Sequence, residues 1–76
     1  RVPMKATTKM QKFIAYGRAW DSKLNDWHPL KVIFMAKDRA SANAKLRQVI
    51  SIEAELLELE RPYAHLVLPF PHMGYA

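Results

Sequence analysis

The chain of 76 residues has no cysteine, only two glycines and no long run of apolar residues. Without cysteine it can form no disulfide, no thiol nucleophile and no zinc site of the cysteine type. Gly17 and Gly74 are too far apart to build a glycine-rich loop around a phosphate. The longest apolar run, Val32 to Ala36, is much shorter than the roughly 18 residues that a membrane span needs. We therefore expect no transmembrane span.

Groups that could do chemistry are few and badly spaced. No two of the three histidines have the i, i+4 spacing of a helical metal site; they are His28, His65 and His72. Four glutamates between residues 53 and 60 spread around a predicted helix, with no His, Lys or Ser placed to share a proton. We predict no catalytic, cofactor-binding or metal residue, no small-molecule substrate and no enzymatic activity.

The apolar content is high for so short a chain. Half of the residues are apolar, yet a domain of this size buries only roughly 60% of the surface that its unfolded chain exposes. Stability that the small core cannot supply has to come from association. This mismatch predicts a subunit of a larger assembly rather than a free-standing domain.

Charge is distributed unevenly along the chain. Residues 1–47 hold eleven of the twelve Lys and Arg residues and three of the seven Asp and Glu residues, whereas the four glutamates lie in residues 48–76. A basic first part suits nucleic acid or an anionic membrane surface, and an acidic second part suits contact with protein.

The clearest helical signal begins at Ser41, whose hydroxyl is a suitable N-cap, and ends before Pro62, which cannot continue a helix. At about 100° per residue, apolar side chains cover more than half of its circumference. A helix with so wide an apolar surface is expected to contact two neighbouring elements. Both neighbours belong to the same small domain, or one of them belongs to another chain.

A second helix is predicted for residues 7–27, with Phe13, Gly17, Trp20 and Leu24 on its apolar face. Lysines and a tyrosine form a row beside that face. This row is either an ordinary solvated helix surface or a contact for RNA phosphate. Gly17 either allows the close approach of another element or merely weakens the helix. The residues predicted to contact nucleic acid are Lys5, Lys9, Lys12, Tyr16, Arg18 and Lys23.

The segment Leu30–Lys37 is ambiguous. Its Val-Ile-Phe centre favours a strand, whereas its place between Pro29 and an alanine-rich stretch favours a helix. We predict a helical region over 29–60. The alternative is a strand that pairs with Ala64–Leu68, with the helix as the crossover between them.

Residues 61–76 are rich in proline and in apolar side chains, which predicts an extended tail that lies across a partner. Residues 1–6 are predicted to form an extended arm. The fold class expected from these elements is mainly α, with two or three helices and no large independent core. The residues predicted to contact protein are Trp20, Trp27, Ile52, Leu56, Leu59, Tyr63, Leu66, Leu68 and Phe70.

The sequence Ile52-Glu53-Ala54-Glu55, with basic residues upstream and Pro62-Tyr63 downstream, resembles a segment of a small basic protein of the mitochondrial large ribosomal subunit. The resemblance implies a matrix protein that contacts ribosomal RNA and neighbouring protein subunits. We therefore expect a non-catalytic structural subunit of an organellar ribosome. The alternative is an accessory subunit of a respiratory or ATP-synthase complex, in which the basic part faces anionic lipid or an acidic subunit.

Overall fold

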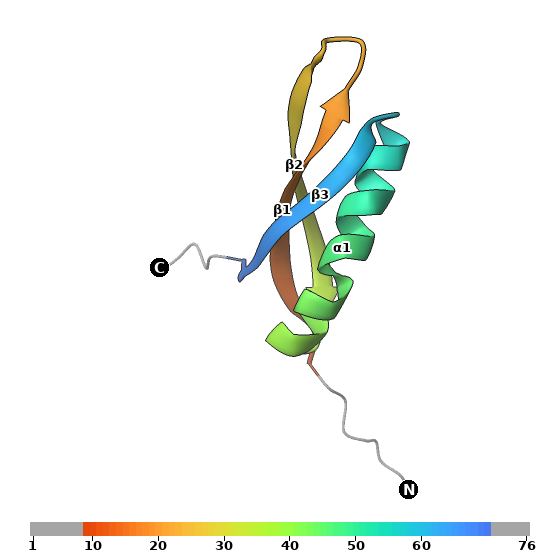
Figure 1. The fold of residues 1–76 in the computed structure, drawn as a ribbon. Coiled ribbons are helices and arrows are strands. Elements are labelled where there is room, and N and C mark those ends of the chain that lie inside the picture. The colour runs from red at the N-terminus through yellow and green to blue at the C-terminus, as the bar shows by residue number, and fades with distance from the viewer. Residues whose placement is uncertain (1–8, 71–76) are drawn as a thin grey trace, which may run out of the picture.

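The computed structural model describes residues 9–70, which form one three-stranded antiparallel sheet and one helix (Figure 1). The elements follow one another as β1 (Gln11–Asp21), β2 (Asp26–Ala36), α1 (Arg39–Leu56) and β3 (Glu60–Pro69). The strand order is β2-β1-β3, so the first strand of the chain is the central one. Helix α1 connects the two outer strands and packs against one face of the sheet (Figure 1).

The predicted mainly α fold is wrong, and so is the basic helix predicted over 7–27. That segment contains all of β1 and the start of β2, which pair along their full length from Gln11↔Ala36 to Asp21↔Asp26. Alternate residues of a strand point to opposite faces of the sheet. In β1 both sets include apolar side chains, so no alternation of polar and apolar residues marks the strand in the sequence. The residues that face α1 are Phe13, Ala15, Gly17 and Ala19.

The predicted helical region 29–60 is also wrong at both ends, because α1 spans only Arg39–Leu56. The preceding residues belong to β2, so the strand alternative for Leu30–Lys37 is correct in kind. Its proposed pairing with Ala64–Leu68 is wrong, since β1 lies between β2 and β3. The Val-Ile-Phe segment is β-branched and aromatic, which suits a strand, and β2 pairs with β1 along its whole length.

The predicted extended tail is a paired strand over most of its described length. Residues 60–69 form β3, which is antiparallel to β1, while residues 71–76 and the predicted arm 1–6 lie outside the described residues. The register shifts twice, with His65 as an extra residue between the pairs Gly17↔Ala64 and Tyr16↔Leu66. Such a bulge changes which residues face inward. Ala64 and Val67 therefore both pack towards α1. A regular strand places inward-facing residues two positions apart, so this spacing of three does not look like a strand in the sequence.

The prolines of the described chain lie only in outer strands. Pro29 is in β2, and Pro62 and Pro69 are in β3, whereas β1 has none. Proline has no N–H to donate to a ladder, so it is tolerated at the edge of a sheet and not in its centre. This distribution agrees with β1 as the central strand.

The N-cap of helix α1 lies three residues before the predicted one. Asp38 is the N-cap, and its carboxylate accepts a hydrogen bond from the backbone N–H of Ser41 at 2.8 Å. Hydrogen bonds from the backbone N–H and the hydroxyl of Ser41 hold the pKa of Asp38 below its ordinary value. Ser41, the predicted cap, is instead the residue that donates to the cap.

The helix ends well before Pro62, in a Schellman motif. The N–H of Leu59 donates to the carbonyl of Ala54 at 2.8 Å, and the N–H of Glu58 donates to the carbonyl of Glu55 at 3.0 Å. Glu58 has a φ of 59°, the left-handed conformation for which glycine is the usual residue. The lack of a glycine here explains why the sequence does not signal this end.

The core between α1 and the sheet is small. Ten apolar residues are buried, and five of them are alanines, so the buried area per residue is low. Ile50 is the largest fully buried side chain. Nine of the buried residues lie between α1 and the sheet, whereas Ile14 is on the opposite face; the nine are Phe13, Ala15, Ala19, Leu30, Ala36, Ala42, Ile50, Ala54 and Val67.

Gly17 lies in the central strand between the backbone of β3 and the side chain of Ile50 in α1. A Cβ atom at this position would be 2.5 Å from the backbone oxygen of Tyr63 and 3.0 Å from Cγ2 of Ile50. Of the two interpretations of this glycine, the close approach of another element is the correct one. Two elements make this approach: β3 through the backbone oxygen of Tyr63, and α1 through the side chain of Ile50.

Candidate nucleic-acid and protein interface

The face of the sheet opposite α1, called the open face below, has no covering element among residues 9–70 (Figure 1). Residues that are directly paired across strands lie on the same face, so the register defines its members. On β1 they are the even-numbered residues from Lys12 to Trp20, and on β2 their partners from Trp27 to Met35. On β3 the open face includes Tyr63, Leu66 and Leu68.

Arg18 is at the centre of the half of the open face nearest the β1–β2 turn. Its guanidinium carbon lies 4.7 Å from the ring centre of Trp27 and 5.0 Å from that of Tyr63. The two rings come from the two outer strands, so the arginine is held between them. A guanidinium stacked on aromatic rings is attracted to them and loses little further freedom when it binds a ligand.

Arg18 lacks the partners that a half-buried arginine usually has. Its Nε atom is buried and has no hydrogen-bond partner. Among the described residues the one ion pair joins Lys23 to Glu58, so no carboxylate neutralises Arg18. The Nη groups of Arg18 are neither buried nor hydrogen-bonded within the described residues, so they, and not the buried Nε, are the donors available to an acceptor from outside the chain.

Two further aromatic residues, Tyr16 and Trp20, lie on either side of Arg18 in β1 and extend this surface. Trp20 and Trp27 are cross-strand partners, and their rings meet edge to face with centres 5.2 Å apart. Trp27 is 40% exposed and Tyr63 is 55% exposed, so part of each ring is open to solvent. We call Arg18 and its aromatic neighbours the aromatic patch; these neighbours are Tyr16, Trp20, Trp27 and Tyr63.

The other half of the open face is aliphatic. Exposed large apolar side chains gather there from both outer strands, next to the buried Ile14 in β1. A contiguous apolar surface of this kind on a small protein marks a contact with another molecule. We call it the aliphatic patch; its members are Ile33, Met35, Leu66 and Leu68.

The charge of the open face is positive. Lys12 and Lys31 lie on it with Arg18, and Lys12 Nζ is 5.3 Å from the ring centre of Phe70. Glu60, opposite Trp20 at one end, is the acidic residue that the register places there. A basic surface with interleaved aromatic rings attracts an anionic ligand that also offers flat apolar groups.

The structure brings together half of the residues predicted to contact nucleic acid. Lys12, Tyr16 and Arg18 share the open face because they are all even-numbered residues of one strand. Lys9 precedes β1 and is exposed, and Lys5 lies outside the described residues. The helical spacing that selected this set is wrong, and alternation along a strand is what aligns three of its members.

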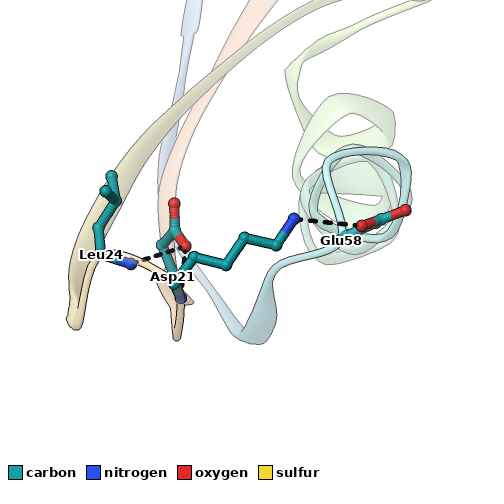
Figure 2. A network of polar contacts seen from close by, with 4 residues as sticks. Asp21, Leu24 and Glu58 are labelled. Atoms are coloured by element: carbon teal, nitrogen blue, oxygen red, sulfur yellow. Dashed lines mark hydrogen bonds and ion pairs between the residues drawn. The ribbon is translucent and has the colours of Figure 1, made fainter.

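Lys23 is separated from that group by its place in the β1–β2 turn. There the carboxylate of Asp21 accepts hydrogen bonds from the backbone N–H groups of Lys23 and Leu24, at 3.0 and 3.3 Å (Figure 2). The ammonium group of Lys23 reaches Glu58 at the end of α1, at 3.4 Å (Figure 2). Lys23 thus links the turn to the helix.

Most residues predicted to contact protein lie on the open face. Trp20, Trp27 and Tyr63 are in the aromatic patch, and Leu66 and Leu68 are in the aliphatic patch. Phe70, which donates its N–H to the carbonyl of Lys12, is half-buried beside them. Leu59 packs against the core instead. Ile52 and Leu56 are exposed on α1, away from the other members.

The sequence reasoning missed the contribution of β2. Lys31, Ile33 and Met35 complete the open face, and none of them was among the predicted site residues. These three residues recur at every second position, which is the spacing of one face of a strand, but the sequence analysis predicts a helix for this segment. Once a strand is assumed, the odd-numbered residues of β2 fall on one face.

Residues 9–70 contain no group of three or more His, Asp or Glu side chains placed to hold a metal ion. Within the same range, the helix is neither long nor apolar enough to cross a membrane. Comparison of the chain with protein-family models, curated proteins and solved structures gave no match.

Proposed function

We propose that this protein is a non-catalytic structural subunit of a large ribonucleoprotein, an organellar ribosome in the mitochondrial matrix. The observation that carries the proposal is the open face, which combines a basic aromatic patch with an aliphatic patch. The first has the chemistry of a contact with ribosomal RNA, and the second that of a contact with a neighbouring protein subunit. The resemblance of residues 52–63 to a protein of the mitochondrial large subunit supports the same assembly.

The small core supports the role of a subunit. A chain whose buried residues are half alanine gains little free energy from its own packing. Covering the open face in an assembly removes exposed apolar area from water and adds to the stability of the fold. In the assembly the chain then lies between RNA and a neighbouring protein subunit, and the open face of its sheet contacts both.

The proposal is tested by following an affinity-tagged full chain in its native cells on a sucrose gradient, with and without ribonuclease. We expect it to sediment with the large ribosomal subunit and to be released when the RNA is digested. Recovery with a membrane complex, unchanged by nuclease, contradicts the proposal and supports an accessory subunit of a respiratory or ATP-synthase complex.

A pair of variants connects this result to the open face. Arg18→Gln removes the charge at the centre of the aromatic patch, whereas Arg47→Gln removes an equal charge from an exposed position on α1. We expect the first to lower the fraction of tagged chain on the ribosomal subunit and the second to leave it unchanged. Equal effects would mean that net charge, and not the open face, drives incorporation.

A further inference from the structure

We propose that the ligand of the aromatic patch is an unpaired segment of RNA, with its bases stacked on the aromatic rings and an acceptor group bound by Arg18. This inference rests on the proposed function and makes it specific, because it names the kind of RNA that the open face selects. It excludes duplex RNA as the preferred ligand.

The exposed rings are the first reason. In a duplex the faces of the bases are covered by their neighbours, and proteins contact A-form RNA mainly through its phosphates and 2′-hydroxyl groups. Trp27 and Tyr63 offer ring surface to solvent on opposite sides of Arg18. Only bases that are free of a helix can lie flat on such rings.

The state of Arg18 is the second reason. The guanidinium is fixed by two rings, has no carboxylate partner within residues 9–70 and has a buried Nε without an acceptor. A phosphate oxygen or the edge of a base can accept from the Nη groups of Arg18, which are not buried, while the two rings hold the plane of the guanidinium. A lysine at this position would keep the positive charge but would lack the planar guanidinium group.

Charge complementarity is the third reason. Lys31 is opposite Tyr16 in the middle of the open face, and Lys12 lies further along β1. Lys31 and Arg18 place positive charge within the aromatic half, Lys12 adds a charge at the aliphatic end of β1, and Glu60 lies opposite Trp20 at the other end. A single strand carries its phosphates and bases on opposite sides, which fits a surface with both components.

The chain carries its own reporter for this site. Its only two tryptophans, Trp20 and Trp27, are both members of the aromatic patch and touch each other. A base that stacks there changes tryptophan fluorescence, whereas a polyanion that binds elsewhere by charge alone does not. Fluorescence therefore distinguishes stacking from general electrostatic binding.

The test is a titration of the full chain with a short single-stranded RNA of mixed sequence, a duplex of the same sequence, and polyphosphate. Tryptophan fluorescence and the anisotropy of a labelled RNA are both recorded. We expect quenching and tight binding with the single strand, at least tenfold weaker binding with the duplex, and no quenching with polyphosphate.

Variants sharpen the result. Trp27→Leu and Tyr63→Leu are each expected to weaken binding to the single strand by about tenfold. Arg18→Lys should weaken it while leaving the dependence on salt concentration almost unchanged, because the charge is kept. Arg47→Gln is the matched surface control and should behave like the original chain. Circular dichroism verifies that each variant folds.

Three contrary outcomes are distinguishable. Equal affinity for duplex and single strand, or binding without quenching, overturns the inference but leaves a ribosomal RNA contact in place. Failure to bind any RNA, together with sedimentation that ignores ribonuclease, overturns the proposed function itself. If Arg18→Lys binds as the original chain does, the stacked guanidinium has no role and the inference also fails.

Discussion

Single residues with unusual geometry show where this small fold is under constraint. Gly17 has no room for a side chain, because a Cβ atom would come within 2.5 Å of a backbone oxygen of β3. We expect Gly17→Ala to lower the free energy of unfolding by about 1–3 kcal/mol, the usual cost of overpacking. Chemical denaturation measures the change, with Ser22→Ala in the exposed turn as the control.

A neutral Gly17→Ala would mean that α1 and β3 do not approach β1 as closely as the structure has them. Because backbone and a buried Ile50 side chain both limit the space, a small rotation of one side chain cannot relieve the contact. The control is expected to change stability by less than about 0.5 kcal/mol.

At Glu58 the situation is reversed: a side chain is present at a position whose left-handed backbone conformation favours glycine. A left-handed conformation costs a residue with a Cβ atom roughly 1–2 kcal/mol. The ion pair with Lys23 is exposed on both sides, and such pairs contribute about 0–1 kcal/mol. The conformational cost is the larger of the two, so we expect Glu58→Gly to stabilise the fold by about 0.5–1 kcal/mol.

Glu58→Ala separates the two contributions in the same denaturation experiment. It removes the ion pair but keeps a Cβ atom in the left-handed conformation. We expect a change within about 0.5 kcal/mol for this variant. Stabilisation by alanine equal to that by glycine would show that conformational strain at residue 58 is not the cause.

The helix cap predicts a dependence of stability on pH. The pKa of Asp38 is lowered in the folded chain by hydrogen bonds from Ser41, so its contribution is complete above the unfolded value of about 3.9. The contribution is lost as the pH falls through the lower folded pKa. Asn caps a helix as well as Asp but does not titrate there.

We therefore expect Asp38→Asn to lose less stability than the original chain between pH 5 and strongly acidic conditions (about pH 2). Thermal unfolding of both proteins across this range measures the difference, while Asp38→Ala should be less stable at every pH. Parallel curves for the original chain and Asp38→Asn would show that the cap is not linked to protonation.

At the scale of elements, β3 is the part whose role changes most from prediction to structure. It pairs with the central strand, contributes Val67 to the core and supplies Tyr63, Leu66 and Leu68 to the open face. It is thus both part of the fold and part of the interface. A segment with two bulges performs both functions because each bulge redirects the side chains that follow it.

Deleting residues 60–76 should abolish cooperative unfolding and most of the sheet signal in circular dichroism. The reason is that β1 loses one of its two neighbours and the core opens at Ala15 and Val67. A two-stranded hairpin with one helix is marginal in water. Deleting residues 71–76 removes no residue of the described fold and serves as the control.

If the chain without β3 still unfolds cooperatively, the strand is not part of the folding unit. The tail would then act as the strap that its composition predicts, and deletion would affect assembly alone. Sedimentation of the truncated chain with the parent complex distinguishes the two outcomes.

At the scale of the whole molecule, the sheet has one covered face and one open face, and only the covered face resembles the interior of a domain. The aliphatic patch leaves large side chains in water, with Ile33 51% exposed. Isolated chains can lower this cost by associating through their open faces. We expect the purified protein to self-associate as its concentration rises.

Ile33→Lys should reduce this self-association without destabilising the monomer, because the side chain lies on the open face and not in the core. Light scattering measures the association, and Ile52→Lys on α1 is a control of similar exposure. Unchanged association for Ile33→Lys would place the contact elsewhere. The same variant should incorporate poorly into the parent complex.

The sequence by itself determined several properties of this protein. The absence of cysteine, the uneven charge and the apolar excess are composition, and folding does not alter them. The existence of a helix through residues 41–56 was also predictable, since its helix-forming residues act locally. The aromatic residues of the site were predicted to be contact residues, and Trp20 and Trp27 meet as cross-strand partners and not on a helix.

Only the tertiary structure decided that 11–21 is a strand and which residues share its open face. That segment shows a helical pattern at Phe13, Gly17 and Trp20 and no alternation of polar and apolar residues, so local sequence does not indicate the strand. Pairing with β2 and β3 decides the conformation, and β3 is about 50 residues away along the chain. Strand register depends on two distant segments at once, and this is why neither segment reveals it alone.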